Sequence, residues 1–194
     1  MFKIFTTLFL ITFFFISCKD SVEENTDAKF KLFNLNNAGW KSKTLSHNES
    51  KINYKATQVP LQYYILKNGP SEDPIVVDSI YRSHSKERII EFEFQHDTKD
   101  DLLKAEYTKM DYTKSIKYMS FNLKEDFELI TNSGERIKCS GVTFERNFKV
   151  APYKRALLHF ANVPENDNVK LLYRDKLFGN GLFKYNFNEA PIKL

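Results

Sequence analysis

The sequence is poor in the patterns from which most enzyme active sites are built. It has only six glycines in 194 residues, which leaves little room for strained catalytic loops. It contains no G-x-S-x-G nucleophile elbow and no glycine-rich phosphate loop. The four histidines, His47, His84, His96 and His159, show none of the spacings typical of a metal site. We therefore expect no catalytic residues, no metal site and no cofactor.

Blocks of like charge are also lacking. The 29 Lys and Arg residues and the 25 Asp and Glu residues are interspersed, and the formal net charge is +4. A nucleic-acid-binding surface would show clustered basic residues. The charge pattern therefore predicts no nucleic-acid partner.

The longest apolar run lies at the start of the sequence. Residues 4–16 consist of Ile, Leu, Phe and Thr and follow Lys3. As a helix this run would be about 20 Å long, against about 30 Å for a bilayer core. It has no polar face, unlike a helix that packs on a globular core. The run predicts a secretory signal peptide, and the alternative is a buried helix at the start of the domain.

A cysteine directly follows this run. Phe15-Ile16-Ser17-Cys18 resembles the lipobox of bacterial lipoproteins, with Phe15 where leucine is commoner. The resemblance implies that residues 1–17 are removed and that Cys18 carries a lipid. Two or three acyl chains on one residue would anchor the protein firmly, since each buried methylene contributes about 0.8 kcal/mol. The alternative for Cys18 is a free or disulfide-bonded thiol.

A polar tether is predicted after the lipid attachment site. Residues 18–28 contain four acids and a single larger apolar side chain, Val22, so they cannot bury enough surface to fold. Lys19-Asp20 resembles the start of the surface-export signal of Bacteroidota lipoproteins, although Ser21 interrupts the acids. These resemblances imply an outer-membrane lipoprotein that faces the periplasm or the cell surface.

Residues 29–194 show the pattern of one all-β domain. In "RIIEFEFQH" (88–96) and "GLFKYNFNE" (181–189), apolar and polar residues alternate as in half-buried strands. Seven further segments also read as short strands: 51–58, 61–67, 75–83, 126–131, 136–146, 155–160 and 169–175. The turn spacing predicts an antiparallel immunoglobulin-like β-sandwich. From about Tyr112 onward, the pattern loosely resembles the telokin-like or immunoglobulin-like modules of bacterial lipoproteins.

Three local features refine this prediction. "TNSGER" (131–136) predicts a hairpin turn with Gly134 at positive φ. The apolar parity changes between Ile137 and Val142, which predicts a β-bulge at Ser140-Gly141. Residues 97–110 predict one or two helical turns, capped by Asp97 or Thr98.

The second cysteine, Cys139, has no partner for an internal disulfide once Cys18 is lipidated. It alternates with Ile137 in a predicted strand, so we expect a small buried apolar residue. A reactive thiol is the alternative.

Aromatic residues are the candidate ligand contacts. Trp40 lies in a polar segment beside Asn36 and Asn37 and is a candidate for stacking on a sugar ring or peptide; the alternative is that it closes one end of the sandwich. Tyr63 and Tyr64 are adjacent, so in a strand one of them faces away from the core. Glu91 and Glu93 lie about 7 Å apart on one predicted strand face, and we interpret them as solvated side chains rather than a glycosidase pair.

Together these features predict a lipid-anchored, non-catalytic binding or adaptor module for an envelope protein or glycan. A structural accessory subunit of an outer-membrane or periplasmic complex, joined by strand addition, is the alternative. A hydrolase with a dispersed active site is the third hypothesis.

Overall fold

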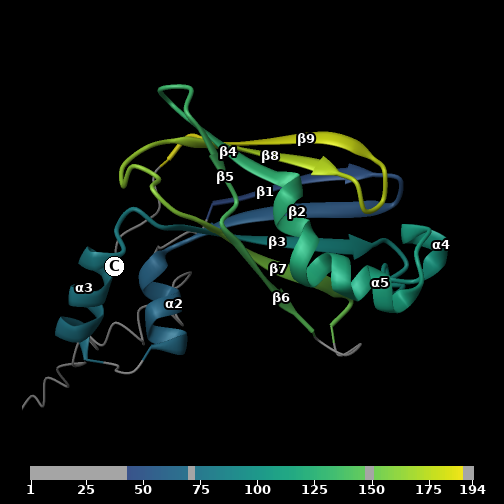
Figure 1. Ribbon diagram of the computed structural model, residues 1–194, viewed down its shortest axis with the longest axis horizontal. Helices are drawn as coiled ribbons and strands as arrows, with labels where there is room; N and C mark the ends of the chain where they lie inside the picture. Colours follow the sequence, from purple (N-terminus) through teal and green to yellow (C-terminus); the bar gives the residue numbers. More distant parts are fainter. Residues whose placement is uncertain (1–42, 70–72, 147–150, 190–194) are drawn as a thin grey trace, which may run out of the picture.

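The computed structural model describes residues 43–69, 73–146 and 151–189. Within these ranges the chain forms two packed antiparallel sheets, which confirms the predicted β-sandwich (Figure 1). The five-stranded sheet has the order β1-β2-β3-β7-β6, with β1 Lys43–Glu49, β2 Ile52–Val59, β3 Arg88–His96, β7 Tyr153–Phe160 and β6 Gly141–Glu145. The four-stranded sheet has the order β5-β4-β8-β9, with β5 Arg136–Lys138, β4 Phe127–Thr131, β8 Val169–Asp175 and β9 Gly181–Phe187.

Aromatic rings fill the space between the two sheets, because every second side chain along a strand points into the core. In β3, Ile90, Phe92 and Phe94 are completely buried, as their spacing predicted. The Phe92 ring lies 5.0 Å from that of Tyr173 on β8 and 5.5 Å from that of Tyr185 on β9, between ring centroids. Each such pair contributes about 0.5–1.5 kcal/mol beyond the burial of its apolar area. Contacts between aromatic rings of β3, β8 and β9 therefore join the two sheets in the core.

One edge of the sandwich is closed by a strand that changes sheets. β5 pairs with β4 in the four-stranded sheet, whereas β6 pairs with β7 in the five-stranded sheet. The chain crosses between them at Cys139 and Ser140, where the Ser140 N–H donates to the His159 carbonyl at 2.8 Å. The predicted bulge is therefore wrong. The parity changes because the chain enters a different sheet, in which the inward direction is reversed.

The opposite edge is closed by contacts between β1 and β9. The His47 Nε2 atom on β1 donates to the backbone carbonyl of Lys184 on β9 at 3.0 Å. The His47 ring also lies edge-on to the Tyr185 ring, with centroids 4.8 Å apart. Contacts thus join the two sheets at both edges of the sandwich. Its two outer faces are therefore separate surfaces on opposite sides of the core.

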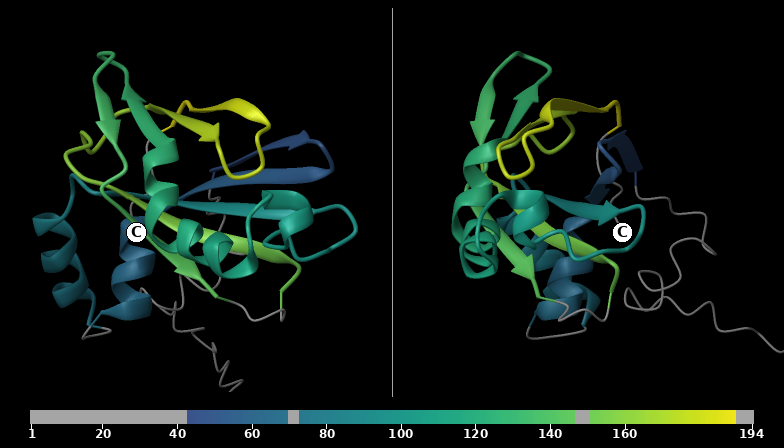
Figure 2. Two further views of the ribbon diagram at one scale, coloured as in Figure 1. Left: turned by 45° about the vertical axis from the view of Figure 1, so that its right-hand side comes forward. Right: turned by 90° about the vertical axis from the view of Figure 1, so that its right-hand side faces the viewer.

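Two predicted strands are helices. Residues 61–67 lie in α2 (Leu61–Asn68), and residues 75–83 lie in α3 (Pro74–Ser83); the two helices pack together at one end of the sandwich (Figures 1 and 2). Their Ile, Val and Tyr residues favour strands, which explains the error. α3 carries a helix start signal, because the Asp73 carboxylate accepts from the Ile75 N–H at 2.9 Å and Pro74 occupies the first turn.

The predicted helical turn in residues 97–110 is present but short, since α4 comprises only Ala105–Thr108. It begins after Lys104, so neither Asp97 nor Thr98 caps it. A helical run that the sequence pattern did not predict follows it and consists of α5 (Tyr112–Lys117), the π-helix η1 (Tyr118–Asn122) and the 3₁₀-helix η2 (Leu123–Asp126). The hairpin at 131–136 is confirmed, and Gly134 has φ +86°.

The predicted signal peptide, Cys18, the tether and Trp40 lie outside the described residues. Among the helices of the described ranges, none has both the length and the apolar character needed to cross a bilayer.

A buried carboxylate ties the two sheets together at the β8–β9 turn. Asp175 is only 4% exposed and accepts hydrogen bonds from the hydroxyls of Tyr173 at 2.9 Å and Tyr54 at 2.8 Å. Its oxygens also accept from the backbone N–H groups of Phe178 and Asn180. Because Tyr54 lies on β2 and Asp175 on β8, this network crosses the core. A buried carboxylate needs such donors, since an unsatisfied charge in a core is costly.

We expect Tyr54→Phe to lower the free energy of unfolding by about 1–3 kcal/mol, because it leaves the buried Asp175 carboxylate short of a donor. Tyr185→Phe is the matched control: its hydroxyl is also buried but makes only a 3.4 Å bond to the Tyr54 carbonyl. Tyr185→Phe should lower the free energy of unfolding by less than about 1 kcal/mol. Urea denaturation of the purified protein measures both changes, and equal losses would contradict this role for Asp175.

Candidate functional site

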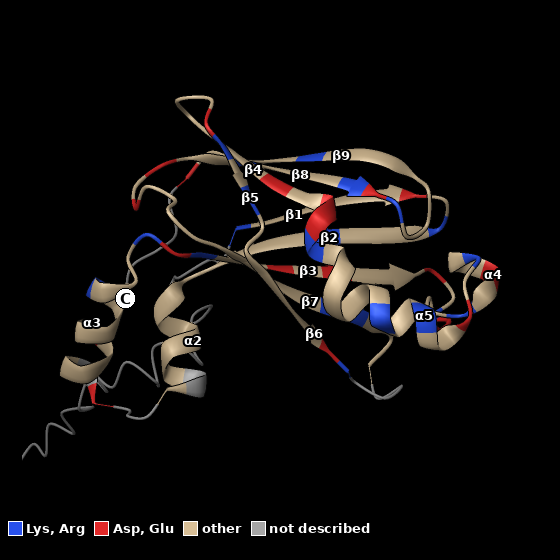
Figure 3. Cartoon of the chain, viewed as in Figure 1, with Lys and Arg blue, Asp and Glu red and all other residues tan. Residues whose placement is uncertain are grey.

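The candidate site is the outer face of the four-stranded sheet. Because side chains alternate along a strand, this sheet turns ten side chains away from the core. Five are cationic and one is acidic, and the others are aliphatic or asparagine (Figure 3). The ten residues are Glu128, Ile130, Arg136, Lys138, Lys170, Leu172, Arg174, Leu182, Lys184 and Asn186. We call them the cationic face.

The strand register arranges these side chains in rows across the sheet. Lys138, Glu128, Leu172 and Lys184 are successive cross-strand neighbours on β5, β4, β8 and β9. Strands lie about 4.8 Å apart, so this row is about 14 Å wide. Arg174 lies two residues beyond Leu172, about 7 Å along β8. Ile130, Leu172 and Leu182 form an apolar diagonal across the sheet. The cations Arg136, Lys138 and Arg174 lie on one side of it and Lys170 and Lys184 on the other, spacings that suit a ligand with several negative charges.

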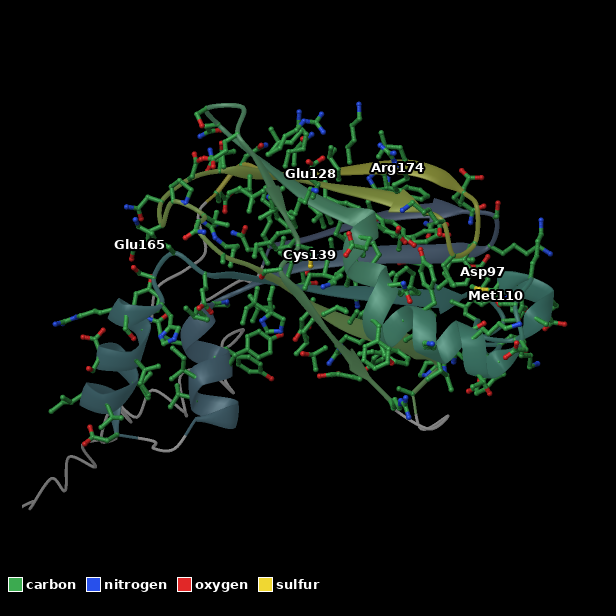
Figure 4. The ribbon with its side chains drawn as sticks, viewed as in Figure 1. Asp97, Met110, Glu128, Cys139, Glu165 and Arg174 are labelled. Carbon is green, nitrogen blue, oxygen red and sulfur yellow. The ribbon has the colours of Figure 1, made fainter. Side chains whose placement is uncertain are left out.

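One end of the cationic face is hollowed into a cavity of about 380 Å³. Leu172 and Leu182 form part of its wall, and Lys138 and Arg174 reach it from β5 and β8. η2 and the β8–β9 turn add Lys124 and Lys176. Figure 4 labels Glu128 and Arg174, which lie on the four-stranded sheet at this cavity.

Each acid at the cavity has a cationic neighbour. Arg136 contacts Glu128 at 2.7 Å, Lys176 contacts Asp126 at 3.0 Å, and Lys124 lies 4.0 Å from Glu125. Lys138 and Arg174 form no ion pair with any residue that the structure describes. Both side chains are exposed. Their positive charges are thus the ones left for a ligand.

Asp126 is the most unusual acid of the cavity. Burial raises its pKa, whereas the Tyr118 hydroxyl, which donates to it at 2.5 Å, and the Lys176 ammonium act in the opposite direction. Tyr118 and Lys176 come from η1 and from the turn after β8, so Asp126 holds the helical run against the sheet. We interpret its role as structural.

Cys139 also lines the cavity but is buried, in agreement with the sequence analysis. Burial raises the pKa of its thiol to about 11. Since the thiolate is the reactive form, the thiol is almost wholly protonated at neutral pH. Its S–H group lies 3.0 Å from the Gly141 carbonyl oxygen, which accepts the hydrogen bond.

The outer face of the five-stranded sheet has the opposite charge balance. Its outward positions include three acids, Glu91, Glu93 and Glu145, and two cations, Lys55 and Arg155. The prediction that Glu93 is a solvated side chain is wrong. It is buried beneath Arg155, whose Nη2 donates to it at 2.6 Å, and it also pairs with Lys55. Positive charge is therefore concentrated on one side of the sandwich.

Tyr63 and Tyr64 lie on α2, so the strand argument for an outward tyrosine does not apply to them. Tyr64 is buried against Val59, Ile89 and Leu157, and its hydroxyl donates to Glu91 at 2.5 Å. Tyr63 is half-buried, and its ring lies edge-on to that of Tyr64. The structure thus places this pair at the junction between α2 and the sheet, away from the cationic face.

The cationic face was not predicted from the sequence. Its signal was readable in "RIK" (136–138), "KLLYR" (170–174) and "LFKYN" (182–186), where basic residues occupy the polar positions of alternating strands. What the sequence did not reveal is that these strands join one sheet.

Comparisons with protein families, with curated protein sequences and with solved structures found no match. Within the described ranges, no group of three or more His, Cys, Asp and Glu residues has the geometry to hold a metal ion.

Proposed function

We propose that this protein is a lipid-anchored module of the cell envelope that binds an anionic ligand on its cationic face. The observation that carries this proposal is the ratio of five cations to one acid on one outer sheet face, whereas the mature chain is nearly balanced. The cavity at Lys138 and Arg174 is the centre of the site.

The electrostatics support an extended ligand rather than a single small ion. One exposed ion pair contributes only about 0–1 kcal/mol, so a single contact would bind weakly. Several cations spread over a face of about 14 Å can act together on a ligand that carries repeated charges. Binding of this kind weakens with salt, because exposed charges are screened beyond about 10 Å at 0.1 M.

The alternative of an accessory subunit joined by strand addition needs an accessible strand edge. β1 and β9 contact each other across one edge, and β6 lies against η1. The remaining edge strand, β5, has only three residues. This arrangement favours the binding module.

The hydrolase hypothesis has one point in its favour, because three carboxylates line the cavity. A glycosidase pair needs one protonated acid and one free carboxylate. Burial raises the pKa of Asp126, as a general acid needs, but the Tyr118 hydroxyl and the Lys176 ammonium stabilise its carboxylate form, and Glu125 and Glu128 also have cationic neighbours. We therefore propose binding without catalysis, and the release of new reducing ends from a glycan probe would contradict this.

The first test uses charge reversal on the cationic face. Lys138→Glu with Arg174→Glu should weaken binding of polygalacturonate and polyphosphate at least about tenfold, or about 1.4 kcal/mol. The physical reason is that the two cations that line the cavity without an ion pair are replaced by repelling charges. Fluorescence anisotropy at 50 and 300 mM NaCl measures the affinity and its salt dependence.

The matched control is Lys86→Glu with Lys117→Glu. Both lysines are exposed and lie outside the four-stranded sheet, and the change in net charge is the same. The affinity of this control variant for both polyanions should stay within about twofold of wild type, because salt screens the electrostatic effect of distant charges. Equal losses in both double variants, or no polyanion binding by wild type, would refute the proposed site.

The second test concerns the anchor at Cys18. Cells that express the wild-type protein should incorporate labelled fatty acid into it, whereas Cys18→Ala should abolish the label. Cys139→Ala is the control and should keep the label. Labelling of Cys18→Ala, or no label on wild type, would disprove the anchor. Protease treatment of intact cells then separates surface exposure from a periplasmic position.

A further inference from the structure

A second hollow lies on the cationic face, at the opposite end of the strands from the 380 Å³ cavity. Its volume is about 240 Å³. It is formed where β4 and β9 end and β8 begins, whereas the first cavity lies at the other end of the same three strands. The residues that line it are Ile130, Thr131, Asn132, Asn168, Val169, Lys170, Asn186, Phe187 and Asn188.

Four asparagines are the distinguishing feature of this hollow. Asn132 lies in the β4–β5 turn, Asn168 directly precedes β8, Asn186 points outward from β9, and Asn188 follows β9. The Asn132 backbone N–H donates to the Asp167 carboxylate at 3.1 Å, which fixes the turn against the β8 entry loop. Residues far apart in the sequence are thus brought to one place by strand pairing.

The side-chain amides of these four asparagines make no hydrogen bond within the part of the chain that the structure describes. Each amide offers two N–H donors and one carbonyl acceptor. Lys170 adds a cation at the same place and faces Asn186 across the β8–β9 pair. The hollow therefore presents donors and acceptors together beside a positive charge.

This combination matches the chemistry of a sugar. Hydroxyl groups both donate and accept hydrogen bonds, so they can pair with both the N–H donors and the carbonyl acceptor of an amide. Ionised phosphate and carboxylate groups only accept, so they can use the amide N–H donors and the lysines but leave the amide carbonyls without a donor. Lys170 and Arg174 lie four residues apart on β8, about 13 Å by strand rise. An oligosaccharide of a few rings covers that length.

We infer that the ligand of the cationic face is an acidic glycan that lies along the strands of the four-stranded sheet. Its acidic groups bind at Lys138 and Arg174, and its hydroxyls bind the asparagines at the other end. This inference rests on the proposed function, since it names the chemical class of the ligand for the same face.

The test compares two polyanions that differ in hydroxyl groups. Asn168→Ala with Asn186→Ala should weaken binding of an oligogalacturonate about fivefold, the expected effect of losing net hydrogen bonds. The affinity for inorganic polyphosphate, which has no sugar hydroxyls, should stay within about twofold, because the cations are unchanged. The matched control is Asn122→Ala with Asn166→Ala, two exposed asparagines outside the hollow, which should change neither affinity.

The outcomes separate this inference from the proposed function. An equal loss of affinity for both probes in the asparagine variant, or no loss for either, would overturn the inference that the ligand is an acidic glycan. The proposed anion binding is then still tested separately, by charge reversal at Lys138 and Arg174. Retained polyphosphate binding also shows that the asparagine variant is folded. If wild type binds neither probe, both the inference and the proposed function fail.

Discussion

The burial of Asp175 in the core is the constraint on which the arrangement of the two sheets depends. A carboxylate in a nearly closed aromatic core is tolerated only where donors surround it. Tyr173 and Tyr54 supply hydroxyls from opposite sheets, and the β8–β9 turn supplies two N–H groups. Burial and the nearby carboxylate raise the pKa of both tyrosines, so they remain protonated donors. The network thus holds β8 and β9 in register against β2.

The composition of the cationic face follows from this packing. Once Tyr173, Phe183 and Tyr185 face inward, Arg174, Leu182 and Lys184 must face outward, because successive side chains alternate. The apolar pattern that builds the core therefore also sorts the charges. On the five-stranded sheet, the same sorting places the acids Glu91 and Glu93 around Arg155, which neutralises them. On the four-stranded sheet, by contrast, Lys138, Lys170, Arg174 and Lys184 form no ion pair with any residue that the structure describes.

The alternating segments 88–96 and 181–189 were sufficient to predict the strands and the sandwich, because alternation depends on near neighbours. Segments 61–67 and 75–83 are helices although their Ile, Val and Tyr content favours strands, because tertiary packing overrides this local propensity. The parity change at Ser140-Gly141 was detected, but only long-range pairing shows that the chain changes sheets there. The partner of Glu93, Arg155, lies 62 residues away. The cationic face depends in the same way on the pairing of β4 with β8, which no local pattern specifies.

The most direct test of the account is to map where an acidic oligosaccharide binds, by amide chemical-shift changes in the isotope-labelled protein during titration with oligogalacturonate. If the cationic face binds the ligand, the largest changes fall on β4, β5, β8 and β9, with further changes at Lys124, Asn132 and Asn168. Residues of the five-stranded sheet, such as Glu91 and Arg155, should change little. Changes concentrated on that sheet or on α2 and α3 would contradict the central claim that the cationic face is the binding site.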